Sequence, residues 1–292
     1  MRAAIAALLC VWTLACAPAP PAPAPSPALW RIADADSEIW LFGTVHVLPP
    51  ELAWESQAVT DAFAAADELV TETDASSTGA VAFPAMVQRY GLADGGPPLS
   101  SRMSAEDRAR LQRAAREAGL DLAALERMRP WFAALQISYA QATRAGHRSE
   151  AGVEVVLAAR AQAQGKRLSF FETREAQIRI LADLPEDVQL HFLSVTLRQA
   201  EGDAHVLAEM DGAWAAGDIV TLGRLLDAQW RQAGPVLHEA LILQRNRVWA
   251  DEIVRRLNGS GRVFVAVGAA HLVGDGNVIA LLRARGLEVE GP

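Results

Sequence analysis

The sequence predicts an α/β fold in which a largely parallel central sheet is flanked by helices and interrupted by a helical insertion. Short apolar runs typical of strands alternate with longer helical patterns, which favours parallel strands joined by right-handed crossovers. A block of purely helical patterns, about 81–163, stands in the middle of this alternation. Since no change in composition marks a second domain, we expect one domain over residues 29–292 that contains this insertion.

Residues 1–16 have the pattern of a secretory signal peptide, with a positive charge before a short apolar run. The stretch that ends at Cys16 resembles a bacterial lipobox, in which that cysteine is lipidated, although Thr13 stands where a leucine is usual. A cut after Ala17 would instead release a soluble protein. The Ala- and Pro-rich residues 17–28 then form a stiff tether. We therefore expect an exported chain, in a bacterial periplasm or anchored to the outer membrane, whose only membrane attachment is a lipid at Cys16.

Further along the chain, apolar runs are expected to become strands, and the first two form a hairpin because only a short polar stretch separates them. Helical patterns occupy most of the intervals between the strands. The expected strands are 29–32, 39–42, 68–72, 166–171, 262–267 and 287–289. The expected helices outside the insertion are 55–66, 174–182, 186–201, 236–257 and 276–285.

The composition limits the kinds of partner and site. The chain has a formal charge of -8, with 35 acidic against 27 basic residues, which disfavours binding to nucleic acid or to an anionic membrane surface. Its two cysteines, Cys10 and Cys16, fall within the signal peptide. The folded part therefore lacks both a disulfide and a thiolate metal site, so any metal must be held by histidine, aspartate or glutamate.

Four of the expected strands end close to a histidine or a glutamate, namely His46, Glu72, Glu172 and His271. Residues just beyond the carboxyl ends of parallel strands line the crevice in which open α/β sheets bind ligands. Taken singly, each has an ordinary structural explanation, as a loop histidine or as a helix cap. Their convergence on one edge of the sheet is what indicates a functional site.

A glycine precedes each of the two histidines, in a Gly-x-x-His motif at the end of an apolar strand. At Gly43 and Gly268 the missing side chain lets the backbone turn sharply and lets a ligand approach closely, so both are expected at the binding site. The spacing alone is weak evidence, because the stretch that ends at His205 has the same spacing in helical surroundings.

Two histidines and a carboxylate form the ligand set of a catalytic divalent metal with one open position for water. Arg245, on the helix before the last long strand, has two alternative placements. It can reach the crevice and clamp a negative charge, or it can lie on the solvated face of its helix.

Together with further motifs, these residues resemble the TraB/GumN family, which is also grouped with the pheromone-shutdown PrgY proteins and the animal Tiki proteins. The resemblance implies an α/β core with a helical insertion. Tiki members are metal-dependent proteases that use two Gly-x-x-His motifs and a glutamate, which points to His46, Glu72 and His271 as metal ligands. Phe171 stands where relatives commonly have leucine, and it keeps that position apolar. The motifs lie at 29–32, 41–46, 70–74, 152–154, 172–177, 214–218, 245–249 and 267–274.

The wider superfamily adds two alternatives. It is similar to erythromycin-esterase-like hydrolases, in which His, Glu, Arg and His act without an obligatory metal. It is also similar to ChaN-like haem-binding surface lipoproteins. The resemblance therefore indicates the fold more sharply than the function.

The function expected from the sequence is hydrolysis of a peptide or other acyl bond by an envelope protein with a divalent metal, such as Mn, Co or Zn. His46, Glu72 and His271 hold this metal and lower the pKa of its bound water, with Glu72 as ligand or general base. Arg245 stabilises developing negative charge, and Glu172 belongs to the same catalytic set. Two alternatives stay open: a metal-independent esterase, and a non-catalytic lipoprotein that binds haem, a metal or an envelope partner. The substrate is not indicated.

Overall fold

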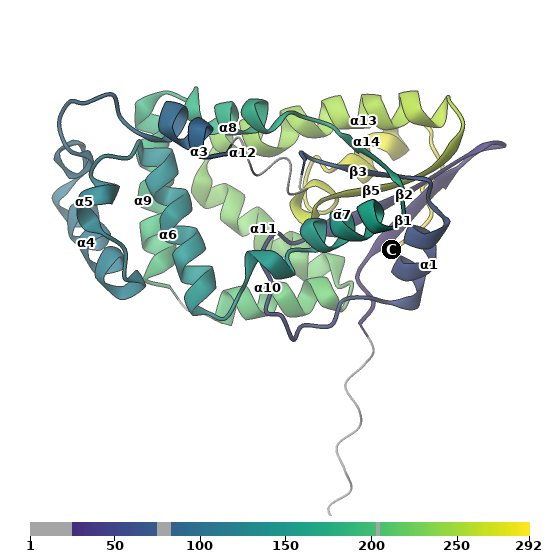
Figure 1. Ribbon diagram of the computed structural model, residues 1–292, viewed down its shortest axis with the longest axis horizontal. Coiled ribbons are helices and arrows are strands. Elements are labelled where there is room, and N and C mark those ends of the chain that lie inside the picture. The colour runs from purple at the N-terminus through teal and green to yellow at the C-terminus, as the bar shows by residue number, and fades with distance from the viewer. Residues whose placement is uncertain (1–24, 75–82, 203–204) are drawn as a thin grey trace, which may run out of the picture.

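The computed structural model describes residues 25–74, 83–202 and 205–292. A five-stranded sheet in the order β1-β2-β5-β3-β4 forms its centre (Figure 1). In chain order the strands are β1 (Leu29–Ala33), β2 (Ser37–Thr44), β3 (Glu68–Thr71), β4 (Arg167–Phe170) and β5 (Gly261–Gly268). β1 pairs antiparallel with β2, and the other neighbours pair parallel, which confirms the predicted α/β fold with a largely parallel sheet.

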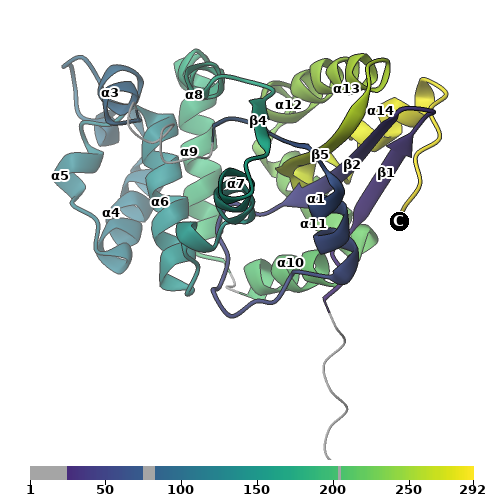
Figure 2. The same ribbon diagram turned by 45° about the vertical axis from the view of Figure 1, so that its right-hand side comes forward.

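Helices cover both faces of the sheet, which is why the central strands β2 and β5 are buried along most of their length. Figures 1 and 2 show α13 and α14 on one face and α1 and α7 on the other. Phe264 of β5 packs between Phe42 and Phe63, whose ring centroids lie 5.8 and 5.5 Å away. The helices around the sheet are α1 (Gln57–Ala65), α7 (Val153–Ala163), α10 (His205–Ala215), α11 (Ile219–Ala233), α13 (Gln244–Leu257) and α14 (Val278–Ala284).

A second group of helices lies beside the sheet, at the left of Figure 1, and has its own apolar core. Leu111 of α4 packs there with Ile137 of α6 and with Leu193 and Leu197 of α9. The group comprises α3 (Phe83–Met86), α4 (Ala105–Ala118), α5 (Leu122–Leu125), α6 (Pro130–Arg144), α8 (Arg174–Ala182) and α9 (Glu186–Ala200). α12 (Pro235–His238) and a π-helical segment, Glu239–Leu243, lead from α11 into α13.

The helical insertion expected at about 81–163 differs from the structure at its C-terminal end. Its described part, 83–163, consists of helices and their connections and adds no strand to the sheet. However, α7 packs against β3 and β4 as the crossover helix between them, and its buried Ala158 and Ala161 belong to the core of the sheet. α8 and α9 follow β4 in the sequence but pack within the helical group.

The last expected strand, 287–289, is not formed. Beyond α14 the chain meets the sheet at Glu290, which exchanges two backbone hydrogen bonds with Arg31 of β1. Gly291 follows with a φ of 105°, a left-handed conformation, so the backbone leaves the extended path that a strand needs.

The predicted signal peptide, 1–16, and most of the tether, 17–28, lie outside the described residues. The last tether residues contact the domain, because the Ser26 N–H donates to the Ala215 carbonyl at 2.9 Å. Among the helices in the described part of the chain, none combines the length and apolarity needed to span a membrane.

The turn after β2 is held in place from three sides. Trp214 of α10 donates its Nε1–H to the Gly43 carbonyl at 2.8 Å, and a Cβ on Gly43 would lie 3.1 Å from Ala269 Cα. The missing side chain at Gly43 therefore allows close backbone packing, and the ligand contact expected there from the sequence stays a prediction. On the third side, a Cβ on Gly152 would lie 2.3 Å from the His46 carbonyl oxygen. This packing fixes the backbone from which the His46 side chain projects.

Gly152→Ala is expected to destabilise the protein by about 1–3 kcal/mol, the usual cost of overpacking, because the added methyl overlaps the His46 carbonyl. Gly212→Ala is the control. It lies within α10 with nothing inside 4 Å of an added Cβ, so it should stabilise by up to about 1 kcal/mol through helix propensity. Urea unfolding followed by circular dichroism measures both changes. An unchanged midpoint for Gly152→Ala would contradict the tight packing of this turn.

Candidate functional site

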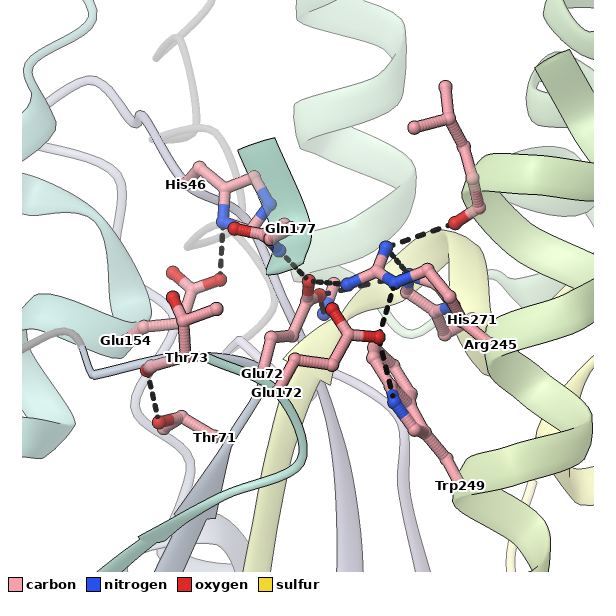
Figure 3. A network of polar contacts seen from close by, with 12 residues as sticks. His46, Thr71, Glu72, Thr73, Glu154, Glu172, Gln177, Arg245, Trp249 and His271 are labelled. Carbon is pink, nitrogen blue, oxygen red and sulfur yellow. Dashed lines mark hydrogen bonds and ion pairs between the residues drawn. The ribbon is translucent and has the colours of Figure 1, made fainter. Parts of the chain in front are cut away.

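The carboxyl ends of the four parallel strands bring the candidate side chains together at one edge of the sheet (Figure 3). His46 follows β2, Glu72 follows β3, Glu172 follows β4 and His271 follows β5. Arg245 reaches them from the first turn of α13 and is buried, so it lies in the crevice rather than on a solvated helix face. Other histidines, to which no role was given, contact residues elsewhere: His147, His191 and His238.

Arg245 is the centre of the cluster because each of its three nitrogens has a partner there. Nη2 donates to Glu72 Oε2 at 2.6 Å, and Nε donates to Glu172 Oε1 at 2.8 Å. Nη1 donates at 2.9 Å to the Leu241 carbonyl, in the π-helical segment before α13. The guanidinium also lies over the Trp249 ring, 4.5 Å from its centroid. Arg245 is thus fixed between two carboxylates and supplies one positive charge to the pair.

Glu72 is a buried carboxylate with hydrogen bonds on both oxygens. Oε1 accepts from the Gly268 N–H at 2.8 Å, and Oε2 accepts from Gln177 Nε2 at 2.8 Å as well as from Arg245. Burial raises the pKa of this carboxyl, but the positive charge of Arg245, with His46 and the hydrogen bond from Gly268, outweighs burial and holds the pKa below its ordinary value. Glu72 is therefore ionised at neutral pH and can accept a hydrogen bond but cannot donate one.

His271 is buried and neutral. Its Nδ1 lies 2.6 Å from Asn246 Oδ1, which assigns the hydrogen to Nδ1, and Nε2 accepts from Arg245 Nη1 at 3.1 Å. Burial lowers the pKa of the imidazole to about 3, and Arg245 adds to this effect while Glu72 opposes it. Both ring nitrogens are engaged, so His271 is an ordered and uncharged part of the wall of the site.

His46 lies in the opposite environment, because 68% of its side chain is exposed and its ring pairs with a carboxylate. Nδ1 lies 2.5 Å from Glu154 Oε1, which also accepts from Thr44 Oγ1 at 2.5 Å. Glu154 is buried in the first turn of α7, where the helix dipole favours an anion. The attraction of Glu154 raises the pKa of His46, to an extent that the water around the exposed ring limits. Burial raises the pKa of Glu154, but His46 lowers it overall.

Glu154, Gln177 and Asn246 complete the site, although sequence reasoning assigned none of them a role. All three lie in motifs that carry the family resemblance, which is the one signal that could have found them. Helical periodicity instead placed Glu154 in the insertion expected at about 81–163, not in a helix packed between two strands of the sheet. Its pairing with His46 depends on α7 packing against the sheet, which periodicity does not reveal.

The missing side chain of Gly268 leaves a narrow gap between the histidines and Glu72. A Cβ on Gly268 would be 3.0 Å from Glu72 Oε1, 3.7 Å from His46 Nε2 and 3.7 Å from His271 Cδ2. A side chain at Gly268 would obstruct the approach between His46 and Glu72, and the ligand contact expected there from the sequence stays a prediction.

The contacts of His46, Glu72 and His271 do not fit a joint metal site. The Nε2 lone pair of His271 is directed at Arg245, whose positive charge would stand against a bound cation. Both oxygens of Glu72 already accept hydrogen bonds. Within residues 25–74, 83–202 and 205–292, no three His, Cys, Asp or Glu side chains are grouped so that they could hold a metal ion. The metal stays a prediction from the sequence that the arrangement of these side chains does not favour.

An open cleft of about 390 Å³ lies between the two chain segments that carry His46 and Glu154. Leu48 and Arg148 join these segments through a pair of backbone hydrogen bonds of 3.3 and 2.9 Å. A molecule bound in the cleft therefore lies beside the turn that carries His46. Its walls are largely apolar, with charged groups among them: Leu48, Pro49, Pro50, Leu52, Trp54, Glu55, Arg148, Glu150, Ala151 and Val156.

Comparison with known proteins gives one family and two relatives. The model of the TraB/PrgY/gumN family matches residues 28–291. The chain is 30% identical over 245 residues to the uncharacterized protein YbaP of Escherichia coli (strain K12), and this alignment covers 83% of the chain and 87% of YbaP. The uncharacterized protein YbaP of Shigella flexneri matches to the same extent. No solved structure matches the chain.

Arg245→Ala is expected to lower the free energy of unfolding by about 3–5 kcal/mol, because Glu72 and Glu172 would be left as carboxylates without a counter-charge. Arg245→Lys should recover only part of this loss, since an ammonium cannot reproduce the guanidinium fork. Arg247→Ala, two residues along α13, breaks an exposed pair with Glu239 and should cost less than about 1 kcal/mol. Urea unfolding at neutral pH measures all three. Equal losses at Arg245 and Arg247 would contradict the central role of Arg245.

Proposed function

The chain belongs to the TraB/PrgY/gumN family, and we propose that it is a hydrolase that cleaves an ester or amide bond by general-base catalysis without a metal. The observation that supports this proposal most is the His46–Glu154 pair. One nitrogen of an exposed imidazole is held by a buried carboxylate, and the other borders the narrow gap at Gly268. A carboxylate that orients a histidine in this way is a recurring device of hydrolases. The signal-peptide pattern supports an exported enzyme of the cell envelope.

In the proposed reaction, a water molecule lies between His46 Nε2 and Glu72 Oε1 and donates hydrogen bonds to both. Neutral His46 removes one proton through Nε2 while the water oxygen forms a bond to the carbonyl carbon of the substrate. Glu154 stabilises the imidazolium that results. His46 then returns the proton to the leaving oxygen or nitrogen as the carbon–oxygen or carbon–nitrogen bond breaks. Arg245 keeps Glu72 ionised and in place.

The apolar cleft beside the turn of His46 supports a substrate with an apolar part. Its walls come from the residues just after His46 and from the two sides of Glu154. A substrate anchored there would present its scissile bond near the base, which is how binding energy is converted into orientation.

The metal-dependent peptidase expected from the sequence is the second candidate, and the family resemblance favours it. His271 Nε2 and Glu72 Oε1 lie 3.8 Å apart, so a shift of Arg245 away from His271 would free two of the three expected ligands. A non-catalytic protein that binds haem, a metal or an envelope partner is the third. It needs ligands but no base, and in it Glu154 would orient His46 as a ligand rather than as a base.

A hydrolase panel separates these candidates. Purified protein is assayed on p-nitrophenyl esters and fluorogenic peptides with and without EDTA, and its metal content is measured. We expect hydrolysis that survives EDTA, a loss of about 10²–10⁴-fold in kcat/KM for His46→Ala, and no loss for the control His205→Ala. Activity that EDTA abolishes and Mn, Co or Zn restores would establish the metal mechanism instead. Absence of hydrolysis together with stoichiometric haem or metal would favour the binding protein.

The rate should rise with pH through the pKa of His46, because only the neutral imidazole can accept a proton. Glu154 stabilises the charged form, so the midpoint should lie above about 6.5, the value of an unperturbed histidine. Glu154→Gln removes this attraction and should shift the midpoint toward lower pH while reducing the maximal rate. The dependence of kcat/KM on pH measures both effects. A midpoint that Glu154→Gln leaves unchanged would show that His46 is not the titrating base.

A further inference from the structure

Glu172 has one carboxylate oxygen that finds no partner among residues 25–74, 83–202 and 205–292. Oε1 accepts from Arg245 Nε at 2.8 Å and from Trp249 Nε1 at 3.2 Å. Oε2 is buried and accepts no hydrogen bond from any described residue. A buried carboxylate oxygen without a donor is costly, so it marks a place where a donor from outside the chain is expected.

The charges around Glu172 do not cancel. Glu72 and Glu172 carry two negative charges, while Arg245 supplies one positive charge and His271 is neutral. The remaining carboxylate, Glu154, is paired with His46. The part of the site around Arg245 therefore has one negative charge in excess, and a cationic group next to Glu172 would balance it.

The surroundings hold Glu172 rigidly in this position. Its backbone N–H donates to the Glu72 carbonyl at 2.9 Å. Phe171 stacks on Trp249 at 5.0 Å between ring centroids, and Trp249 in turn donates to Glu172. Figure 3 shows the carboxylates of Glu172 and Glu72 side by side below Gln177, on the same edge of the sheet as His46. A fixed carboxylate is suited to recognition because little order is lost when a ligand binds.

We propose that Glu172 binds a primary ammonium group of the substrate through Oε2. This inference rests on the proposed function and specifies its substrate class: esters or amides that carry a free amino group within a few atoms of the scissile carbonyl. An ammonium supplies both what Oε2 lacks, a hydrogen-bond donor, and what the cluster lacks, a positive charge. A neutral hydroxyl or amide supplies only the donor, and an anionic group is repelled. Glu172 is thereby a specificity residue, separate from the base His46.

The test measures binding directly, without turnover. The indole N–H of Trp249 donates to Glu172, so its nitrogen–proton NMR signal, identified by its loss in Trp249→Phe, reports on this carboxylate. The probes are L-alaninamide, which has a free ammonium, and N-acetyl-L-alaninamide, which has none. We expect L-alaninamide to shift the signal saturably and the acetylated probe to bind at least about tenfold more weakly, the weight of one charge-assisted hydrogen bond.

Two variants make the result decisive. Glu172→Gln should abolish the response to L-alaninamide, whereas Glu175→Gln, at a half-buried position on α8 that contacts Tyr90 instead of Arg245, should retain it. His46→Ala should retain binding and lose hydrolysis, which separates this inference from the proposed reaction. No saturable shift in the wild-type protein, equal binding of both probes, or unchanged binding in a folded Glu172→Gln protein would each overturn the assignment.

Discussion

The bridge that Arg245 forms between Glu72 and Glu172 is the interaction on which the candidate site at the edge of the sheet depends. It joins α13 to the ends of β3 and β4, and through His271 it reaches the end of β5. Removing such charges from water is costly, and their attraction offsets that cost only where donors and acceptors are matched. The cluster meets this condition at every contact of Arg245. Oε2 of Glu172 does not contact Arg245 and has no donor among the described residues, so it is the one carboxylate oxygen beside Arg245 at which this condition is not met.

The two Gly-x-x-His motifs show how surroundings, rather than sequence spacing, decide what a histidine can do. His271 is enclosed beside Arg245 and Asn246, so the neutral form is favoured and neither nitrogen is free. His46 projects from an equivalent strand end into solvent and pairs with Glu154. The attraction of this carboxylate favours the charged form of His46. One motif thus supplies a wall of the site, and the other supplies its one exposed imidazole.

Much of the fold could be predicted because its signals are local. Buried strands that end in glycine, a hairpin with a short polar connection, and helices of regular periodicity each leave a mark within a few residues. The pairing of Glu154 with the end of β2 leaves no such mark, since the hydrogen bond from Thr44 to Glu154 spans 110 positions of sequence. For the same reason the sequence did not reveal that α7 packs against the sheet, or that α9 packs within the helical group. Apolar periodicity shows which face of a helix is buried but not which core receives it.

The pairing of β2 with β5 has a consequence for folding. The two strands at the centre of the sheet come from the first and the last parts of the chain, and their parallel register aligns Ser37 with Gly261 and Thr44 with Gly268. Contacts between such distant positions form slowly, because closing the long loop between them costs chain entropy before the contacts contribute favourable free energy. The helical group, whose contacts are closer in sequence, can collapse earlier. A chain still lacking β5 has neither Gly268 nor His271, so the cluster around Arg245 is completed only when this late-synthesised strand joins the sheet.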